Sequence, residues 1–155
     1  VEDSLGVAAT ELFYKHLFEE YPDVRSMFPD GDMKEQAEKL FKTVTLAVDY
    51  LKDVPSLLPI LADLGGKHAA WDVKREHYDA VGECLIWTLK TGLADAWTDE
   101  VADAWVWVYQ IIAKTMSDAG EEAIAASAAK KADKETTEEK KDDDALFETR
   151  KHAIQ

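Results

Sequence analysis

Apolar side chains recur at steps of three and four residues through most of the first 116 positions of this chain. Such steps bring side chains to one face of an α-helix, whereas a half-buried strand alternates with period two. The first stripe runs through Leu5, Ala8, Ala9, Leu12, Phe13, His16 and Leu17. Because no run of period two interrupts the pattern, the sequence predicts an all-α domain.

Further stripes predict four more helices. They comprise Met33, Ala37, Leu40, Val44, Ala47, Val48 and Leu51; Leu57, Leu61 and Leu64; Tyr78, Val81, Leu85 and Leu89; and Val101, Trp105, Val108, Ile112 and Met116. Pro22 is predicted to open a short helical turn that reaches Phe28, and Pro55 to open the third helix, because proline is favoured in a first turn. Thr98 is the predicted N-cap of the last helix.

The composition changes at Gly120. Residues 121–144 hold nine acidic and five basic residues, and Ile124 is their only apolar side chain larger than alanine. Such a stretch cannot bury enough surface to fold by itself, so it is a linker or, since it lacks proline and glycine, a solvated helix. We therefore expect a core at residues 1–119, a charged linker at residues 120–144, and a weakly apolar segment at residues 145–155.

The net charge of −14 argues against binding to nucleic acid or to an anionic membrane, because like charges repel. No segment approaches the roughly 18 uninterrupted apolar residues that a membrane span requires. A single cysteine, Cys84, excludes an internal disulfide and suits a reducing compartment. We therefore expect a cytoplasmic protein.

His68 continues the apolar stripe of Leu57, Leu61 and Leu64, so its imidazole points into the core. One interpretation is a buried histidine that hydrogen-bonds to the backbone. A single histidine is a poor signal for a zinc site, which needs three or four ligands. Haem requires only one axial imidazole, because the porphyrin supplies four nitrogens itself.

Two stretches, FYKHLFEEYPDVRSMF (13–28) and LGGKHAAWDVKREHYDAVGE (64–83), resemble globins. The resemblance covers roughly residues 1–116 and is closest to bacterial single-domain haemoglobins and to the globin part of flavohaemoglobins. The matching features, in order, are Phe13-Tyr14, Phe28, Lys34-Glu35-Gln36 and Lys67-His68. This resemblance implies the globin fold, a 3-over-3 helical sandwich.

The resemblance also implies a role for each matching residue. His68 resembles the proximal ligand of the iron of haem b, and Tyr14 and Gln36 resemble the distal residues that face a bound gas. Phe28 resembles the phenylalanine that packs on the porphyrin, and Tyr78 the tyrosine beside the proximal imidazole. Leu40, one helical turn after Gln36, would also face the distal side, and Val73, Val81 and Tyr109 match haem-wall positions.

One feature departs from the flavohaemoglobin pattern. That family places a glutamate near the end of the last helix, where it hydrogen-bonds to the proximal histidine. The matching position here is Gly120, with Glu121 and Glu122 following it. Either the helix is shifted or this electron-donating interaction is absent, and its absence would weaken any peroxidase-like activity.

The resemblance implies reversible binding of O2, NO, CO or similar gases. An alternative is nitric oxide dioxygenation with a separate reductase, because the sequence contains no flavin or nicotinamide domain. A sensor module in a larger protein with neighbouring globin domains is a third interpretation. A globin-fold interaction domain without haem is a fourth, disfavoured because Tyr14, Phe28, Gln36 and His68 occur together.

Most globins begin with a helix of about fifteen residues before the one that carries the Phe-Tyr pair. Only Val1 to Leu5 precede Gly6 here, so that first helix is absent or truncated. When residue 155 is joined to residue 1, the combined string resembles an ordinary globin start. We therefore hypothesise a circular permutation, or a domain cut out of register from a tandem array, in which residues 145–155 dock as the first helix. The competing interpretation is a disordered charged tail.

Overall fold

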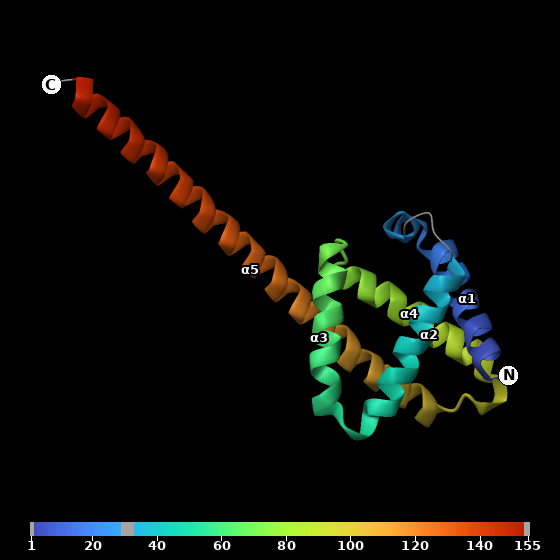
Figure 1. The fold of residues 1–155 in the computed structure, drawn as a ribbon. Coiled ribbons are helices and arrows are strands. Elements are labelled where there is room, and N and C mark those ends of the chain that lie inside the picture. The colour runs from blue at the N-terminus through green and yellow to red at the C-terminus, as the bar shows by residue number, and fades with distance from the viewer. Residues whose placement is uncertain (1, 29–32, 154–155) are drawn as a thin grey trace.

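The computed structural model describes residues 2–28 and 33–153, and these residues form helices and turns without any strand. The elements, with η for a 3-10 turn, are α1 (Glu2–Glu20), η1 (Pro22–Met27), α2 (Met33–Asp49), η2 (Tyr50–Lys52), α3 (Val54–Ala70), α4 (Arg75–Leu93), η3 (Ala94–Ala96) and α5 (Asp99–Ala153). The predicted all-α fold class is confirmed (Figure 1).

The predicted helix boundaries follow local chemistry. Pro22 begins η1, which ends just before Phe28. At the start of α3, Pro55 occupies the first turn and the Asp53 carboxylate accepts a hydrogen bond from the Ser56 amide. The Thr98 hydroxyl accepts one from the Val101 amide at 3.3 Å, which confirms Thr98 as the N-cap of α5.

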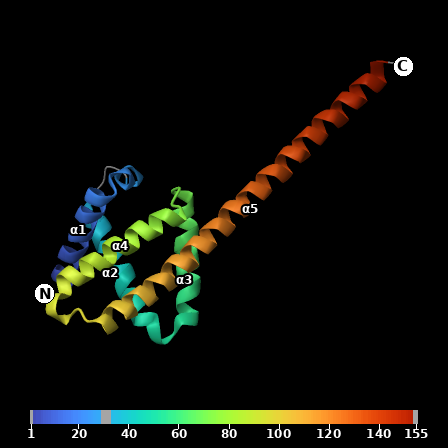
Figure 2. The ribbon, with the colours of Figure 1, turned by 180° about the vertical axis from the view of Figure 1, so that it is seen from behind.

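Helices α1, α2 and α4 enclose one group of buried side chains (Figure 2). Phe13 and Leu17 of α1 are 2 % and 0 % exposed, and they pack with Ala37 of α2 and with Ala80 and Cys84 of α4. The small side chains on α2 and α4 let the larger ones on α1 fill the space between the three helices.

Helices α3 and α5 cross with their backbones in contact (Figures 1 and 2). A Cβ atom at Gly65 would lie 2.2 Å from the Met116 carbonyl oxygen, and one at Gly120 would lie 3.1 Å from the Gly65 carbonyl oxygen. Gly65 therefore tolerates no side chain, since the atoms that such a side chain would meet belong to the backbone of α5.

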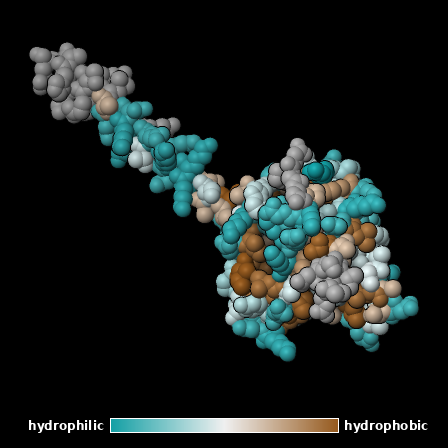
Figure 3. Space-filling model, turned by 45° about the vertical axis from the view of Figure 1, so that its right-hand side comes forward, coloured by the Kyte–Doolittle hydropathy of each residue, from teal (hydrophilic) through white to brown (hydrophobic). Residues whose placement is uncertain are grey.

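Helix α5 continues for 55 residues and passes without a break through the region predicted to be a linker or a solvated helix. Beyond Gly120 it leaves the body of the protein (Figures 1 and 2), and its surface there is mostly hydrophilic (Figure 3). Alanine favours this helix, as do ion pairs one turn apart between Lys131 and Glu135 and between Lys134 and Glu138. The solvated helix is the alternative that the structure adopts.

The structure does not support the permuted arrangement. Residues 145–153 continue α5 and lie far from α1 in both ribbon views, and residues 154–155 fall outside the described part of the chain (Figures 1 and 2). Docking of this segment onto a globin body remains a prediction.

Candidate functional site

The core is divided into two clusters of side chains. The first contains Phe13, Tyr14, Leu17, Val24, Ala37, Ala80 and Cys84, with Phe28, Leu40 and Val81 among the side chains packed on it. The second contains Ala47, Leu57, Leu61, Tyr78 and Met116, with Leu64, Val73 and Ile112 among those packed on it. A domain of this size ordinarily has one contiguous core. The predicted site residues are distributed over both clusters.

His68 lies on α3 at the edge of the second cluster. Its Nδ1 lies 2.8 Å from the Leu64 carbonyl oxygen, and because a carbonyl only accepts, Nδ1 is the protonated nitrogen. Burial lowers the pKa of His68 below 6.5, and the hydrogen bond to Leu64 offsets this only in part. The imidazole is therefore neutral at pH 7. Among the described residues nothing hydrogen-bonds to Nε2, so its lone pair is available to a metal.

Two aromatic rings flank the imidazole. The ring of Tyr78 on α4 is stacked with it at a centroid distance of 6.2 Å. Trp71, one turn after His68, lies 5.4 Å away and is 62 % exposed. The sequence analysis did not single out Trp71 as a neighbour of His68, although the spacing of three residues on a helix predicts such a contact.

Tyr14 belongs to the first cluster and is 9 % exposed. Its ring makes edge-to-face contacts with Phe13 at 5.0 Å and with Phe28 at 5.4 Å. Burial raises the pKa of Tyr14 to about 12, so the phenol keeps its proton at neutral pH. Its hydroxyl has no hydrogen-bond partner among the described residues and remains available as a donor.

Gln36 and Leu40 lie one turn apart on α2, and both are half-buried. Leu40 packs on the cluster that contains Tyr14. The Gln36 amide makes no hydrogen bond to another described residue, so its two donors are uncommitted. The structure thus joins Tyr14, Phe28 and Leu40 directly in one cluster, with Gln36 on the next turn of α2.

The sequence model of the family called Globin matches residues 11–116 of this chain. The chain belongs to the globin family. The predicted globin fold is confirmed by solved structures. One is a bacterial globin from Campylobacter jejuni, 27 % identical, with a TM-score of 0.67 and coverage of 77 % of this chain and 86 % of that one.

Another is a candidate nitric oxide dioxygenase from Rhodothermus marinus that was engineered as a carbene transferase, 27 % identical, with a TM-score of 0.72 and coverage of 79 % and 85 %. A flavohemoprotein from Halalkalibacterium halodurans is 31 % identical over 110 residues, which are 70 % of this globin. The chain covers only 27 % of that relative's length.

Gly120, the position that matches the proximal glutamate of flavohaemoglobins, lies where α3 and α5 cross. Gly120 is buried, and a Cβ atom there would meet the Gly65 carbonyl oxygen at 3.1 Å and the Ala69 Cβ at 3.2 Å. Glu121 pairs with Arg75 instead, with 2.5 Å between Arg75 Nε and the carboxylate. The hydrogen bond of His68 Nδ1 is therefore to a backbone carbonyl rather than to a carboxylate.

Arg75 begins α4 and binds three side chains of α5: Glu121, Asp118 at 2.6 Å, and the Ser117 hydroxyl at 3.0 Å. These contacts raise the pKa of Arg75 and lower that of Glu121, and Lys114 together with Arg75 lowers that of Asp118. The sequence analysis missed Arg75, because its partners are more than 40 positions away.

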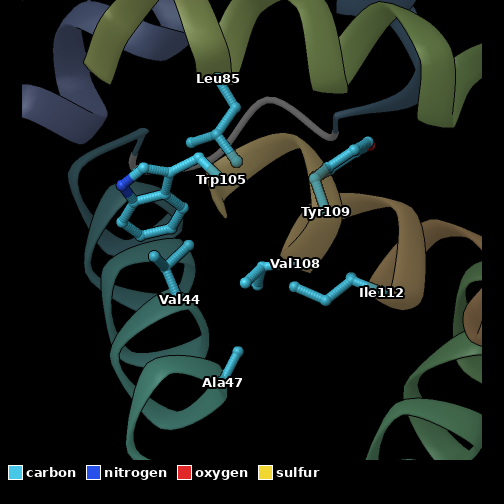
Figure 4. Close-up of a pocket in the computed structure, with 7 residues that line it drawn as sticks. All are labelled: Val44, Ala47, Leu85, Trp105, Val108, Tyr109 and Ile112. Atoms are coloured by element: carbon cyan, nitrogen blue, oxygen red, sulfur yellow. The ribbon is translucent and has the colours of Figure 1, made fainter. Parts of the chain in front are cut away.

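Tyr109 of α5 forms part of an apolar cavity of about 10 Å³, a size that holds at most one water. Figure 4 shows the lining residues Val44, Ala47, Leu85, Trp105, Val108, Tyr109 and Ile112. The Tyr109 hydroxyl donates to the Tyr78 carbonyl oxygen, and a Cβ atom at Gly82 would lie 2.4 Å from the Tyr109 ring. Tyr109 thus fixes the spacing of α4 and α5.

Other reactive groups offer no second site. No group of three or more histidine, cysteine or acidic residues among those described could hold a metal ion. Burial raises the pKa of Cys84 to about 11, so its thiol stays protonated. In the described ranges, no helix is long and apolar enough to cross a membrane.

Proposed function

We propose that this globin binds haem b, with Nε2 of His68 as the axial ligand of the iron. The observation that carries the proposal is the state of this imidazole, which is neutral, oriented through Nδ1 by the Leu64 carbonyl, and free at Nε2. When bound, haem would supply an iron with a coordination position for a diatomic gas.

The division of the core fits a flat, apolar group. Phe28, Leu40 and Val81 pack on the first cluster, while Val73 and Tyr78 belong to the second. A porphyrin between the two clusters would be contacted on both faces by apolar side chains, as the residue roles implied by the resemblance require.

Tyr14 and Gln36 are the proposed hydrogen-bond donors to O2, and NO and CO are the other expected ligands. Both residues retain free donors, and Tyr14 is buried. A hydrogen bond to a ligand that acquires negative charge is stronger than one between neutral groups. This arrangement favours slow release of O2.

Titration with haemin tests the haem site. We expect stoichiometric binding and the spectrum of a histidine-ligated haem, and loss of that spectrum in His68→Ala. In His68→Gly, added imidazole should restore it, which distinguishes lost ligation from misfolding. His16→Ala is the matched control, since His16 stacks on Trp87 at 3.7 Å and has no proposed role. A chain that stays colourless with haemin, or His68→Ala with unchanged ligation, contradicts the proposal.

Nitric oxide dioxygenation is the second candidate, favoured by the likeness to flavohemoproteins and to the Rhodothermus marinus protein. The reaction combines NO, O2 and one electron into nitrate. The electron would come from a separate flavin-containing reductase. Nitrate formation from NO with such a reductase tests it, with Tyr14→Phe as the variant expected to be slower. A rate no higher than that of free haemin contradicts this candidate.

A further inference from the structure

Six consecutive residues near the beginning of α5, residues 104–109, are apolar, and the exposed residues Asp103 and Gln110 flank them. Trp105, Val108 and Ile112 face the cavity between α2, α4 and α5. On the other sides, Val106 is 40 % exposed and Trp107 is 54 % exposed. A helix that is apolar all round is expected to be buried all round. Because this part of α5 has exposed bulky side chains, no described part of the chain fully covers its outer side.

We define the outer α5 face as the stripe Ala104, Trp107 and Ile111, with Val106 beside it. The three residues of the stripe follow each other at steps of three and four, so they share one side of the helix. Ala104 and Trp107 are exposed and Ile111 is half-buried. Asp103 lies one turn before Trp107 and is also exposed.

Apolar residues return in the sequence at the end of the chain. Residues 145–155 include Leu146, Phe147 and Ile154 in an otherwise charged region. Residues 111 and 145 of α5 are separated by about 50 Å at 1.5 Å per residue. Since residues 145–153 continue the same helix, their backbone lies far from the outer α5 face of their own chain.

Charge also favours contact between residues 145–155 of one chain and residues 1–120 of a second copy. Residues 1–120 contain 22 acidic and 11 basic residues, a net charge of −11. Residues 145–155 contain Arg150 and Lys151 against Glu148, a net charge of +1. The segment thus carries a net charge opposite in sign to that of the acidic body.

We propose that residues 145–155 of one chain pack on the outer α5 face of a second copy, in an antiparallel and reciprocal arrangement of the two α5 helices. In the alignment that sets Phe147 opposite Trp107, Lys151 lies opposite Asp103, because each pair of residues is four positions apart. A reciprocal contact repeats each interaction and closes the assembly as a dimer.

Sedimentation of the full chain over a range of concentrations tests the proposal. We expect a monomer–dimer equilibrium with a dissociation constant on the order of micromolar. Trp107→Glu and Phe147→Glu should each raise that constant at least about tenfold, as loss of a central aromatic contact does. Trp71→Glu changes another exposed tryptophan, which lies just after α3 and is 62 % exposed, and it should leave the constant unchanged.

Charge exchange tests the register. Asp103→Lys and Lys151→Asp should each weaken the dimer several-fold, and the double variant should restore it. A chain that stays monomeric, a dimer unaffected by Trp107→Glu and Phe147→Glu, or a double variant no better than the single ones would overturn the proposal. So would a compact monomer in which the segment is docked on its own body.

Discussion

Tyr14 is the residue whose surroundings most restrict what the candidate site can do. Its phenol is buried, protonated at neutral pH and without a partner among the described residues, and its ring is held by Phe13 and Phe28. A held donor loses little freedom when it bonds to a ligand. The hydroxyl is therefore prepared for a small ligand before that ligand arrives.

Replacing Tyr14 with phenylalanine keeps the ring and removes the donor. We expect O2 to dissociate from the haem-bound globin at least about tenfold faster, since a hydrogen bond to a charged group contributes about 1.5–3 kcal/mol and 1.4 kcal/mol is a factor of ten. Stopped-flow displacement of O2 by CO measures the rate. Tyr50→Phe makes the same chemical change at a position with no proposed role, and an equal effect of both variants would refute the assignment.

The pKa of His68 makes the stability of the haem-free protein depend on pH. Because its pKa is below 6.5 in the folded chain, the unfolded chain binds the proton more readily. The free energy of unfolding should therefore fall as the pH drops through about 6.5 towards the folded pKa. His68→Gln should flatten this fall, as measured by urea unfolding at about pH 7.5 and about pH 5.5.

The carboxylates that pair with Arg75 do not obscure this effect. Lys114 and Arg75 lower the pKa of Asp118, and Arg75 lowers that of Glu121, from ordinary values of 3.8 and 4.5. Their contribution to stability is present above those values and is lost as the pH falls below them. A His68→Gln profile parallel to that of the natural chain between about pH 7.5 and pH 5.5 would contradict the histidine assignment.

At the scale of helices, the sequence predicted the features that depend on residues close together in the chain, such as the starts of helices. Pro22, Pro55 and Thr98 mark helix starts because proline and capping hydroxyls act within one turn. His68 could be placed on the core side of α3 from the spacing of its stripe. The composition change at Gly120 did not end α5, because alanine-rich, ion-paired sequence remains helical without a core.

The sequence could not predict the contacts between distant helices. The crossing of α3 and α5 brings Gly65 and Gly120 together, and Arg75 meets Glu121 only because α4 lies beside α5. These contacts between distant helices explain why, among the described residues, no carboxylate hydrogen-bonds to His68. They depend on the packing of whole helices, which neither spacing nor composition records.

Two adjacent glycines of α3 provide a test of that crossing. Gly65→Ala should destabilise the protein by about 1–3 kcal/mol, because its Cβ would overlap backbone atoms of Met116. Gly66→Ala should stabilise it by about 0.5–1 kcal/mol, since nothing lies within 4 Å of the added atom and alanine favours the helix. Urea unfolding of both variants measures the difference, and equal effects would mean that the helices do not cross there.

At the scale of the whole molecule, the chain separates a folded body from a long solvated helix. From Glu121 to Ala145, each side chain that the structure describes is exposed except Ala123, which is half-buried. Such a helix adds little to the stability of the body that carries it, because it buries almost no apolar surface. Under the proposed arrangement, the end of this helix stabilises the body of a second copy rather than its own.

Removing residues 145–155 distinguishes docking of this segment on a second copy from docking on its own body. Far below the dissociation constant of the dimer, a chain that ends at Asp144 should unfold at the same urea concentration as the full chain, because the proposed contacts of the segment form only between two copies. At high protein concentration only the full chain should gain stability, because association stabilises the folded state by mass action. A truncated chain that is already less stable at low concentration would place the segment on its own body, as the first helix of a permuted globin.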